Sequence, residues 1–185
     1  VSNGYLVFIP DVVFRKGEPG ASSYDAVVSG VKSLIDRYDF IDKDRIALNG
    51  HSWGGYQIAF LVTRTNMFKA AVSGAPVVNM TSAYGGIRWE SGKSRMFQYE
   101  QTQSRIGGTL WDKPAEFIRN SPLFFLPQVQ TPVLIMHNDK DGSVMWEQGI
   151  EFFMALRRLD KPVWLFNYKG EGHHLKKWEN RLDYS

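Results

Sequence analysis

The feature that most constrains the fold is the stretch Gly50-His51-Ser52-Trp53-Gly54-Gly55, which has an apolar run before it and helix-like sequence after it. In such a stretch the serine sits on a sharp strand-to-helix turn that pushes its side chain out at the top of a sheet. Side chains at Gly50 and Gly54 would be expected to collide with neighbouring backbone. The turn also directs the Trp53 backbone N–H and the start of the helix toward Ser52, where they can stabilise an oxyanion. The context therefore predicts that Ser52 is a nucleophile.

The rest of the chain alternates short apolar runs with helical stretches. Turn residues bound each run, which is typical of buried parallel strands. The expected strands are Tyr5–Ile9, Arg45–Leu48, Ala70–Val72, Val133–Met136 and Val163–Phe166. Apolar residues spaced three and four apart predict helices over Ser22–Tyr38, after Gly54 and over Val144–Leu159. This order predicts an α/β sandwich with a mostly parallel sheet flanked by helices, whose site lies beyond the carboxyl ends of the strands.

The segment Val77–Pro127 breaks the alternation. It is rich in Gly, Ser, Tyr and Trp and contains the pairs Gly85-Gly86 and Gly107-Gly108. Irregular segments of this length in compact domains are usually lids or binding loops, and a surface insertion is the alternative. We expect this segment to run over the strand ends and favour the binding role.

Composition excludes several classes of protein. A length of 185 residues with 43% hydrophobic residues indicates one globular domain. The net charge of +3 comes from basic residues dispersed among acidic ones, so no nucleic-acid interface is expected. The apolar runs fall well short of the roughly 18 residues that span a bilayer, so no membrane span is expected. Without cysteine the chain has no disulfide or thiolate chemistry, and the compartment stays open between cytoplasmic and periplasmic or secreted.

A serine nucleophile needs a base, and the base needs a third group to orient it. On this strand–turn–helix arrangement the acid follows the serine in the chain and the histidine follows the acid. The acid candidates are Asp139 and Asp141, after the strand Val133–Met136. For the base we choose His173, which follows the flexible turn Gly170-Glu171-Gly172 after the last strand. All of these groups should lie at one edge of the sheet.

The other histidines are expected to play supporting roles. His51 should point away from Ser52 within the tight turn, and His137 should order the acid loop. His174 is expected to pack or to lie on the surface. Side chains of adjacent residues diverge, so no metal shared by His173 and His174 is expected.

Asp139-Lys140-Asp141-Gly142 matches only the middle of a calcium-binding loop. In that alignment His137 stands where the first carboxylate belongs, and Gln148 stands at the closing glutamate position. Zincin, P-loop and dinucleotide-binding patterns are also absent from the sequence. We therefore expect neither a metal nor a cofactor.

Together these features resemble the catalytic domain of the prolyl oligopeptidase family of serine peptidases, in the branch with dipeptidyl peptidases and acylaminoacyl peptidases. The matching landmarks are Asn3-Gly4-Tyr5, Ile9-Pro10-Asp11, the stretch Gly50–Tyr56, Gly74-Ala75-Pro76-Val77, the loop His137–Val144 and Gly170-Glu171-Gly172-His173. The resemblance covers nearly the whole chain and implies an α/β-hydrolase fold. It also selects Asp141 over Asp139, because the family's acid lies three residues before a valine that Val144 matches.

The resemblance further implies a substrate pocket. The family lines this pocket with positions matched by Trp53, Val77 and Val144, and its second oxyanion donor lies upstream of the matched region. Where post-proline dipeptidyl peptidases place a tryptophan, this chain has Met80, and Ala83 stands near another aromatic position. Methionine is adaptable, so a broader apolar pocket is expected rather than strict proline preference.

An intact domain of this family has earlier strands, one of them between Tyr5–Ile9 and Arg45–Leu48, and a helix after Asn180–Ser185. We therefore interpret residues 1–185 as a partial α/β-hydrolase catalytic domain of a longer peptidase, lacking its first strands and last helix, with a β-propeller upstream. An unpaired sheet edge in this excerpt would favour dimerisation or aggregation, and hence a homo-oligomer.

The expected function is hydrolysis of oligopeptides through an acyl-enzyme. The resemblance assigns Ser52 as nucleophile, His173 as base and Asp141 as the acid that holds the imidazole tautomer. One alternative is a carboxylesterase on the same triad, since both reactions use the same acyl-transfer groups. The other is a non-catalytic interaction domain whose site is not assembled.

Overall fold

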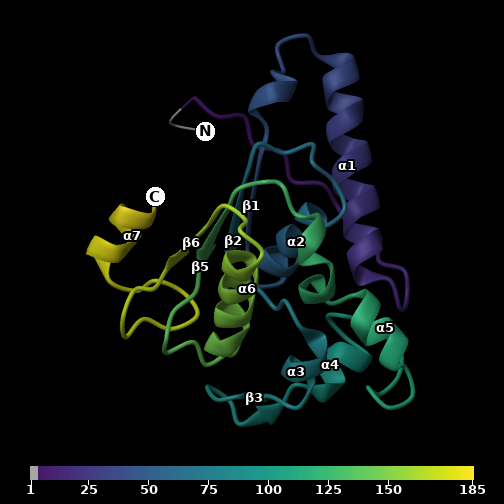
Figure 1. The fold of residues 1–185 in the computed structure, drawn as a ribbon, viewed down its shortest axis with the longest axis vertical. Coiled ribbons are helices and arrows are strands. Elements are labelled where there is room, and N and C mark those ends of the chain that lie inside the picture. Colours follow the sequence, from purple (N-terminus) through teal and green to yellow (C-terminus); the bar gives the residue numbers. More distant parts are fainter. Residues whose placement is uncertain (1–3) are drawn as a thin grey trace.

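A parallel four-stranded sheet forms the centre of the molecule in the computed structural model, which describes residues 4–185 (Figure 1). Its strands are β1 (Ala47–His51), β2 (Ala70–Gly74), β5 (Val133–Met136) and β6 (Val163–Phe166), in the order β1-β2-β5-β6. The register pairs His51 with Gly74, Gly74 with Met136, and Met136 with Phe166. The last residues of all these strands are therefore aligned, and the loops that follow them share one edge.

The main helices carry the apolar faces that cover this sheet. They are α1 (Pro19–Arg37), α2 (Trp53–Val62) and α6 (Trp146–Arg158). Their buried side chains join those of the strands in one core, which includes Val31 of α1, Leu61 of α2, Ile135 of β5 and Leu156 of α6. The spacing of apolar residues thus predicted the helices and the α/β class correctly, within a few residues at the ends.

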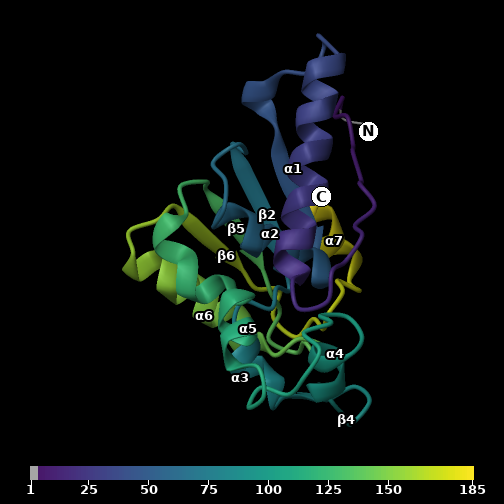
Figure 2. The ribbon, with the colours of Figure 1, turned by 90° about the vertical axis from the view of Figure 1, so that its right-hand side faces the viewer.

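The segment between β2 and β5 contains short elements rather than an unstructured loop. These are α3 (Met80–Tyr84), a hairpin of β3 (Ile87–Arg88) and β4 (Lys93–Ser94), α4 (Met96–Glu100), α5 (Pro114–Arg119) and a 3₁₀ helix (Pro122–Gln128). Figures 1 and 2 both show α3, α4 and α5 gathered at one end of the molecule. They enclose a second apolar cluster, distinct from the sheet core.

The expected strand Tyr5–Ile9 does not form in the part of the chain that the structure describes. Its side chains are exposed, and the segment runs beside α1 (Figure 2), where the Phe8 ring lies so close to Gly30 that a Cβ there would come within 2.7 Å of it. A strand needs a hydrogen-bonded neighbour, and no described strand lies next to this segment; Asn3 of the Asn3-Gly4-Tyr5 landmark lies outside the described residues. The prediction of a strand here was therefore wrong for this structure.

Two smaller differences between the expected and the observed elements lie near the sheet. Lys43–Arg45 forms a 3₁₀ turn, so β1 begins at Ala47 rather than Arg45. The helix α7 (Trp178–Tyr184) was not expected, and Figure 1 shows it across the sheet from α1. Of the helices within residues 4–185, none is both long and apolar enough to cross a membrane.

Candidate active site

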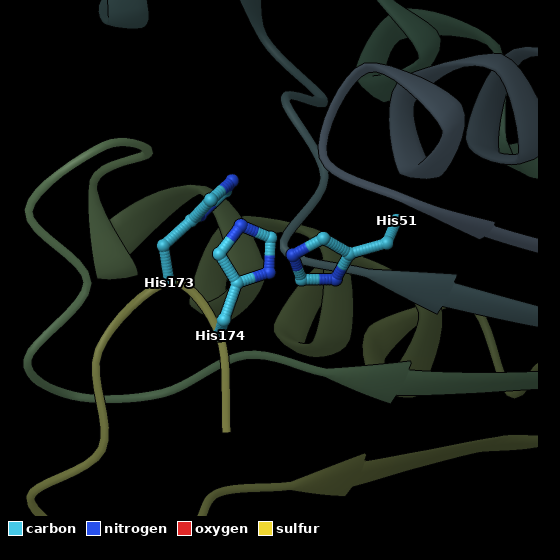
Figure 3. A group of neighbouring side chains, drawn as sticks. All are labelled: His51, His173 and His174. Carbon is cyan, nitrogen blue, oxygen red and sulfur yellow. The ribbon is translucent and has the colours of Figure 1, made fainter. Parts of the chain in front are cut away.

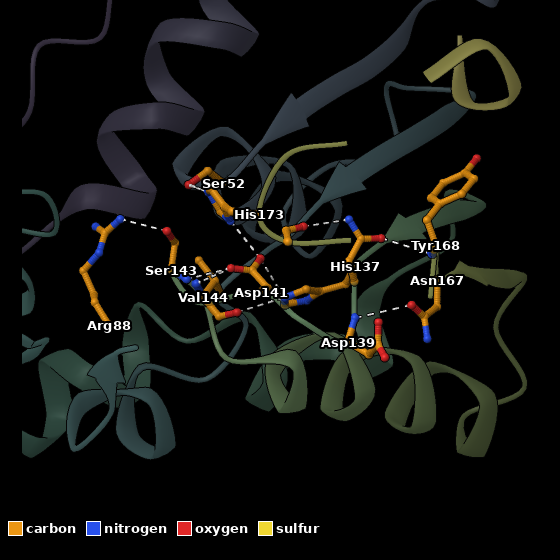
Figure 4. Close-up of polar contacts among 12 residues, drawn as sticks. Ser52, Arg88, His137, Asp139, Asp141, Ser143, Val144, Asn167, Tyr168 and His173 are labelled. Atoms are coloured by element: carbon orange, nitrogen blue, oxygen red, sulfur yellow. Dashed lines mark hydrogen bonds and ion pairs between the residues drawn. The ribbon is translucent and has the colours of Figure 1, made fainter. Parts of the chain in front are cut away.

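Ser52, His173 and Asp141 meet at the shared edge of the sheet, although they come from three loops (Figure 4). The His173 Nδ1 lies 2.7 Å from Oδ2 of Asp141, and its Nε2 lies 2.9 Å from Oγ of Ser52. With the Nδ1 proton donated to Asp141, the Ser52 hydroxyl donates to Nε2. This arrangement lets a proton move from the hydroxyl to an imidazole that a carboxylate orients.

Ser52 is held in an uncommon backbone conformation. Its φ of 60° and ψ of −117° place it between the end of β1 and the first turn of α2. Such conformations cost about 1–3 kcal/mol and persist where the surroundings enforce them. Here the Ser52 N–H donates to the carbonyl of Gly74 at 2.8 Å. The N–H groups of the first helical turn, beginning with Trp53, have no intrahelical acceptor and offer donors beside Ser52.

Close backbone packing explains why two positions near Ser52, Gly50 and Gly55, are occupied by glycine. A Cβ at Gly50 would lie 2.6 Å from the Gly54 carbonyl oxygen, as expected, but a Cβ at Gly54 would meet nothing within 4 Å. The prediction that Gly54 is crowded was therefore wrong. The more crowded position is Gly55, where a Cβ would lie 2.2 Å from the Gly74 carbonyl oxygen.

We expect Gly55→Ala to lower the free energy of unfolding by about 3 kcal/mol or more, because α2 or β2 must shift to admit the methyl group. Gly54→Ala is the matched control: it adds the same methyl group one residue away in open space, and alanine favours a helix by up to about 1 kcal/mol over glycine. Urea unfolding monitored by circular dichroism measures both. Equal stability of the two variants would contradict the packing shown here.

Asp141 is buried, and both of its carboxylate oxygens have polar contacts. Its Oδ1 accepts the backbone N–H groups of Ser143 and Val144, both at 2.8 Å, and Oδ2 faces His173 and His137. Burial alone would raise the pKa of Asp141, but the hydrogen bonds from His137 and His173 and the charge of His173 together hold it well below its usual range. The carboxylate is thus ionised at neutral pH. Asp139, the other candidate, instead accepts the N–H of Gly170 at 2.7 Å.

Three further residues, His137, Asn138 and Glu171, hold the loops of this site. His137 Nε2 lies 3.1 Å from the Val144 carbonyl and 3.3 Å from Asp141 Oδ2, in line with its expected role in ordering the acid loop. Asn138 joins the acid loop, which holds Asp141, to the histidine loop, which follows β6 and holds His173. Its Nδ2 donates to the Gly172 carbonyl at 2.8 Å, and its Oδ1 accepts the Tyr168 N–H at 3.1 Å.

Glu171 holds the part of the histidine loop that follows His173. Its carboxylate accepts the backbone N–H groups of Lys176 and Lys177, both at 2.9 Å, and the side-chain amide of Asn180 at 2.7 Å. These hydrogen bonds lower the pKa of Glu171. The roles of Asn138 and Glu171 were not predicted. Their only sequence signal was proximity in the chain, since Asn138 precedes Asp141 by three residues and Glu171 precedes His173 by two.

The side chains of His51, His173 and His174 are grouped more closely than expected. The His51 ring centroid is 4.8 Å from that of His173 and 4.9 Å from that of His174, so His51 points toward the histidine loop rather than away. The adjacent rings of His173 and His174 do not diverge either, since their centroids are 4.8 Å apart. Burial, followed by the charges of His173 and His174, lowers the pKa of His51 to about 4. The expected direction of His51 and the expected divergence of the His173 and His174 side chains were therefore wrong, whereas His174 is exposed at the surface, as expected.

The four residues expected to line a substrate pocket belong to one apolar cluster. Val77, Met80 and Val144 are buried in it, and Trp53 packs against it and stacks on Tyr56 with ring centroids 4.4 Å apart. Met80 is 0% exposed, so here it packs within the cluster and presents no surface to a ligand. A cavity of about 540 Å³ lies to one side, lined by Phe14, Lys16, Glu100, Gln101, Arg105, Gly107 and Gly108. Its lining meets the cluster at Phe14, whose ring centroid lies 6.2 Å from that of Trp53, and at Glu100, whose carboxylate accepts the Tyr84 hydroxyl at 2.6 Å.

The segment between β2 and β5 contacts the acid loop, as expected for an excursion over the strand ends. The Arg88 guanidinium donates to Ser143 Oγ at 3.0 Å (Figure 4). Ser143 Oγ in turn donates to the Glu90 carboxylate at 3.0 Å. Arg95, which is buried, also donates to the Ser143 carbonyl. These contacts tie the hairpin region to the loop that holds Asp141.

Comparison with known proteins places this site among peptidases. The profile described as the prolyl oligopeptidase family matches residues 14–185. An uncharacterized peptidase of Bacillus subtilis, YuxL, is 31% identical over 166 residues, covering 88% of this chain and 23% of that protein. Human acylamino-acid-releasing enzyme is 29% identical over 174 residues, covering 90% of this chain and 22% of the enzyme.

Solved structures share the fold. An acylaminoacyl peptidase of Pyrococcus horikoshii superposes with a TM-score of 0.72 at 21% identity, over 85% of this chain and 24% of that one. The expected α/β-hydrolase fold is therefore confirmed. The chain spans less than a quarter of the length of these two curated relatives.

Proposed function

The chain belongs to the prolyl oligopeptidase family, as its motifs predicted, and on that premise we propose that it forms the catalytic part of a serine peptidase that cleaves oligopeptides. The observation that carries the proposal is the continuous contact from Asp141 through His173 to Ser52, at 2.7 and 2.9 Å. The relatives named as acylamino-acid-releasing enzymes support an acylated or otherwise blocked peptide as substrate.

In the proposed reaction His173 Nε2 takes the Ser52 proton while Oγ attacks the scissile carbonyl carbon. The C–N bond then breaks, His173 gives its proton to the leaving amine, and the acyl group stays on Ser52 as an ester. Water attacks this ester with His173 again acting as base, which releases the carboxylic acid and restores Ser52. Asp141 remains ionised throughout and holds His173 in the tautomer that accepts at Nε2.

The Trp53 N–H, at the start of α2, is the proposed oxyanion donor, supported by its place directly after Ser52 and by the positive end of the helix. The proposed pocket for the acyl side uses Trp53, Val77 and Val144, and Met80, which is fully buried in the same cluster, supports it from within. Their common apolar cluster supports a broad preference for apolar residues rather than for proline alone.

We also propose that the functional protein is longer than this chain, with the catalytic domain preceded by a β-propeller, because the relatives are several times longer. Among the described strands, β1 has a neighbour on one side only, which supports pairing of its other edge with another strand or another copy. Light scattering of the 185-residue chain tests the second point, and a monodisperse monomer would count against a homo-oligomer.

Reaction with a fluorophosphonate probe tests the proposed function. We expect one probe per chain, with mass spectrometry locating it at Ser52, because among the serines of residues 4–185 only Ser52 contacts a histidine that an acid orients. Matched amide and ester substrates then separate peptidase from carboxylesterase, since turnover of esters alone would favour the esterase. A chain that is folded but unlabelled would favour the non-catalytic interaction domain.

A further inference from the structure

Three histidines form a cluster that includes His173 of the candidate active site (Figure 3). His51 comes from the end of β1, and His173 and His174 come from the loop after β6. Each offers one ring nitrogen within 4.8 Å of the other two. The neutral imidazole is the commonest ligand of transition-metal ions in proteins.

Two observations favour a binding site over a coincidental grouping of side chains. The Nε2 atom of His51 is buried and has no hydrogen-bond partner among the described residues. A buried polar atom without a partner is costly unless something else satisfies it. Figure 3 shows one ring nitrogen of His51 directed at His174, and His174 is exposed, so an ion from solvent can reach this point.

The surroundings of His173 also suit a metal ligand. Its Nδ1 is 2.7 Å from the Asp141 carboxylate, which is the carboxylate–histidine pairing that orients and strengthens histidine ligands of zinc. Its Nε2, which accepts the Ser52 hydroxyl at 2.9 Å when no ion is bound, is the atom that would coordinate the ion in place of that hydroxyl. Zn–N bonds of about 2.0–2.1 Å require nitrogens about 3.4 Å apart, so the cluster must tighten from its present spread of up to 4.8 Å. His174, the exposed member, has room to move toward the other two.

We propose that His51, His173 and His174 bind Zn²⁺ and that the bound ion switches the enzyme off. The inhibitory part rests on the proposed function, because coordination occupies the Nε2 lone pair that must take the Ser52 proton. Ser52 is then left with a hydroxyl that no base activates. Removal of the ion by a chelator returns the lone pair, so the inhibition is reversible.

The experiment measures zinc binding and inhibition separately. Calorimetric titration with zinc chloride is performed on the wild type, on His174→Gln and on Lys176→Gln, a matched control that replaces a nearby exposed cation with the same amide. Fluorophosphonate labelling rates are measured with zinc and with zinc followed by a chelator, each relative to the zinc-free rate of the same variant. Titration of Ser52→Ala gives zinc binding without any catalysis.

We expect one zinc per chain in the wild type, Lys176→Gln and Ser52→Ala, and binding weakened about tenfold or more in His174→Gln. Saturating zinc should slow wild-type labelling by about 100-fold or more, because the general base is lost. Equal zinc affinity in the wild type and His174→Gln would overturn the site. Binding that depends on His174 but leaves labelling unchanged would overturn the inhibition. If zinc binds through His174 but no chain is labelled, the zinc site stands and the proposed function fails.

Discussion

Ser52→Ala is expected to abolish fluorophosphonate labelling and to reduce peptide hydrolysis by roughly 10⁴- to 10⁶-fold. The reaction has no other route to an acyl-enzyme, because His173 contacts Ser52 and no other described hydroxyl. Alanine keeps the Cβ and the backbone, so the unusual φ of 60° is no more costly than with serine. The free energy of unfolding should therefore stay nearly unchanged while the activity is lost.

Ser91→Ala is the matched control, since Ser91 is exposed and lies in the β3–β4 turn. It should label at the wild-type rate. Labelling of Ser52→Ala at the wild-type rate would show that another residue is the nucleophile, and the proposed function would lose its basis. Intact-mass spectrometry after a fixed labelling time distinguishes these results.

Asp141→Asn is expected to lower kcat/KM by about 10⁴-fold. The asparagine Oδ1 can keep the bonds from the Ser143 and Val144 N–H groups, so the loop need not change. Its NH₂ group, however, takes the place of Oδ2 and donates to His173 Nδ1. His173 must then carry its proton on Nε2, where it cannot accept the Ser52 proton.

Asp139→Asn provides the control for this substitution, because it makes the same chemical change two residues away. The Asp139 carboxylate accepts the Gly170 N–H, which an amide oxygen can also do, so kcat/KM should stay within about threefold of the wild type. Steady-state kinetics with one peptide substrate compares the two variants. An equal loss in both would mean that the acid loop, rather than the Asp141 charge, limits the reaction.

Much of the fold followed from local sequence patterns. The apolar runs Val133–Met136 and Val163–Phe166 are β5 and β6 with the predicted ends, since short runs bounded by turn residues have few other ways to be buried. The failure at Tyr5–Ile9 has a different origin. That run has the composition of a strand, but a strand depends on a partner that its own residues do not supply.

The candidate site shows the same division. Glycines around a serine predicted the turn, yet only the three-dimensional packing shows that Gly55, rather than Gly54, faces the Gly74 carbonyl. Likewise, the order serine, acid, histidine predicted which loops meet, because parallel strands end at one edge. The hydrogen bonds by which Asn138 and Glu171 hold these loops could not be predicted, since they depend on loop conformation.

The sequence alone determined the α/β class, the turn that presents Ser52 and the loops that hold Asp141 and His173. These depend on local spacing, on backbone chemistry and on the strand order that the family motifs imply. Only the tertiary structure decided where the side chains of His51 and His174 point. Their directions follow from how the end of β1 and the loop after β6 pack together, and that packing joins residues more than 120 positions apart along the chain.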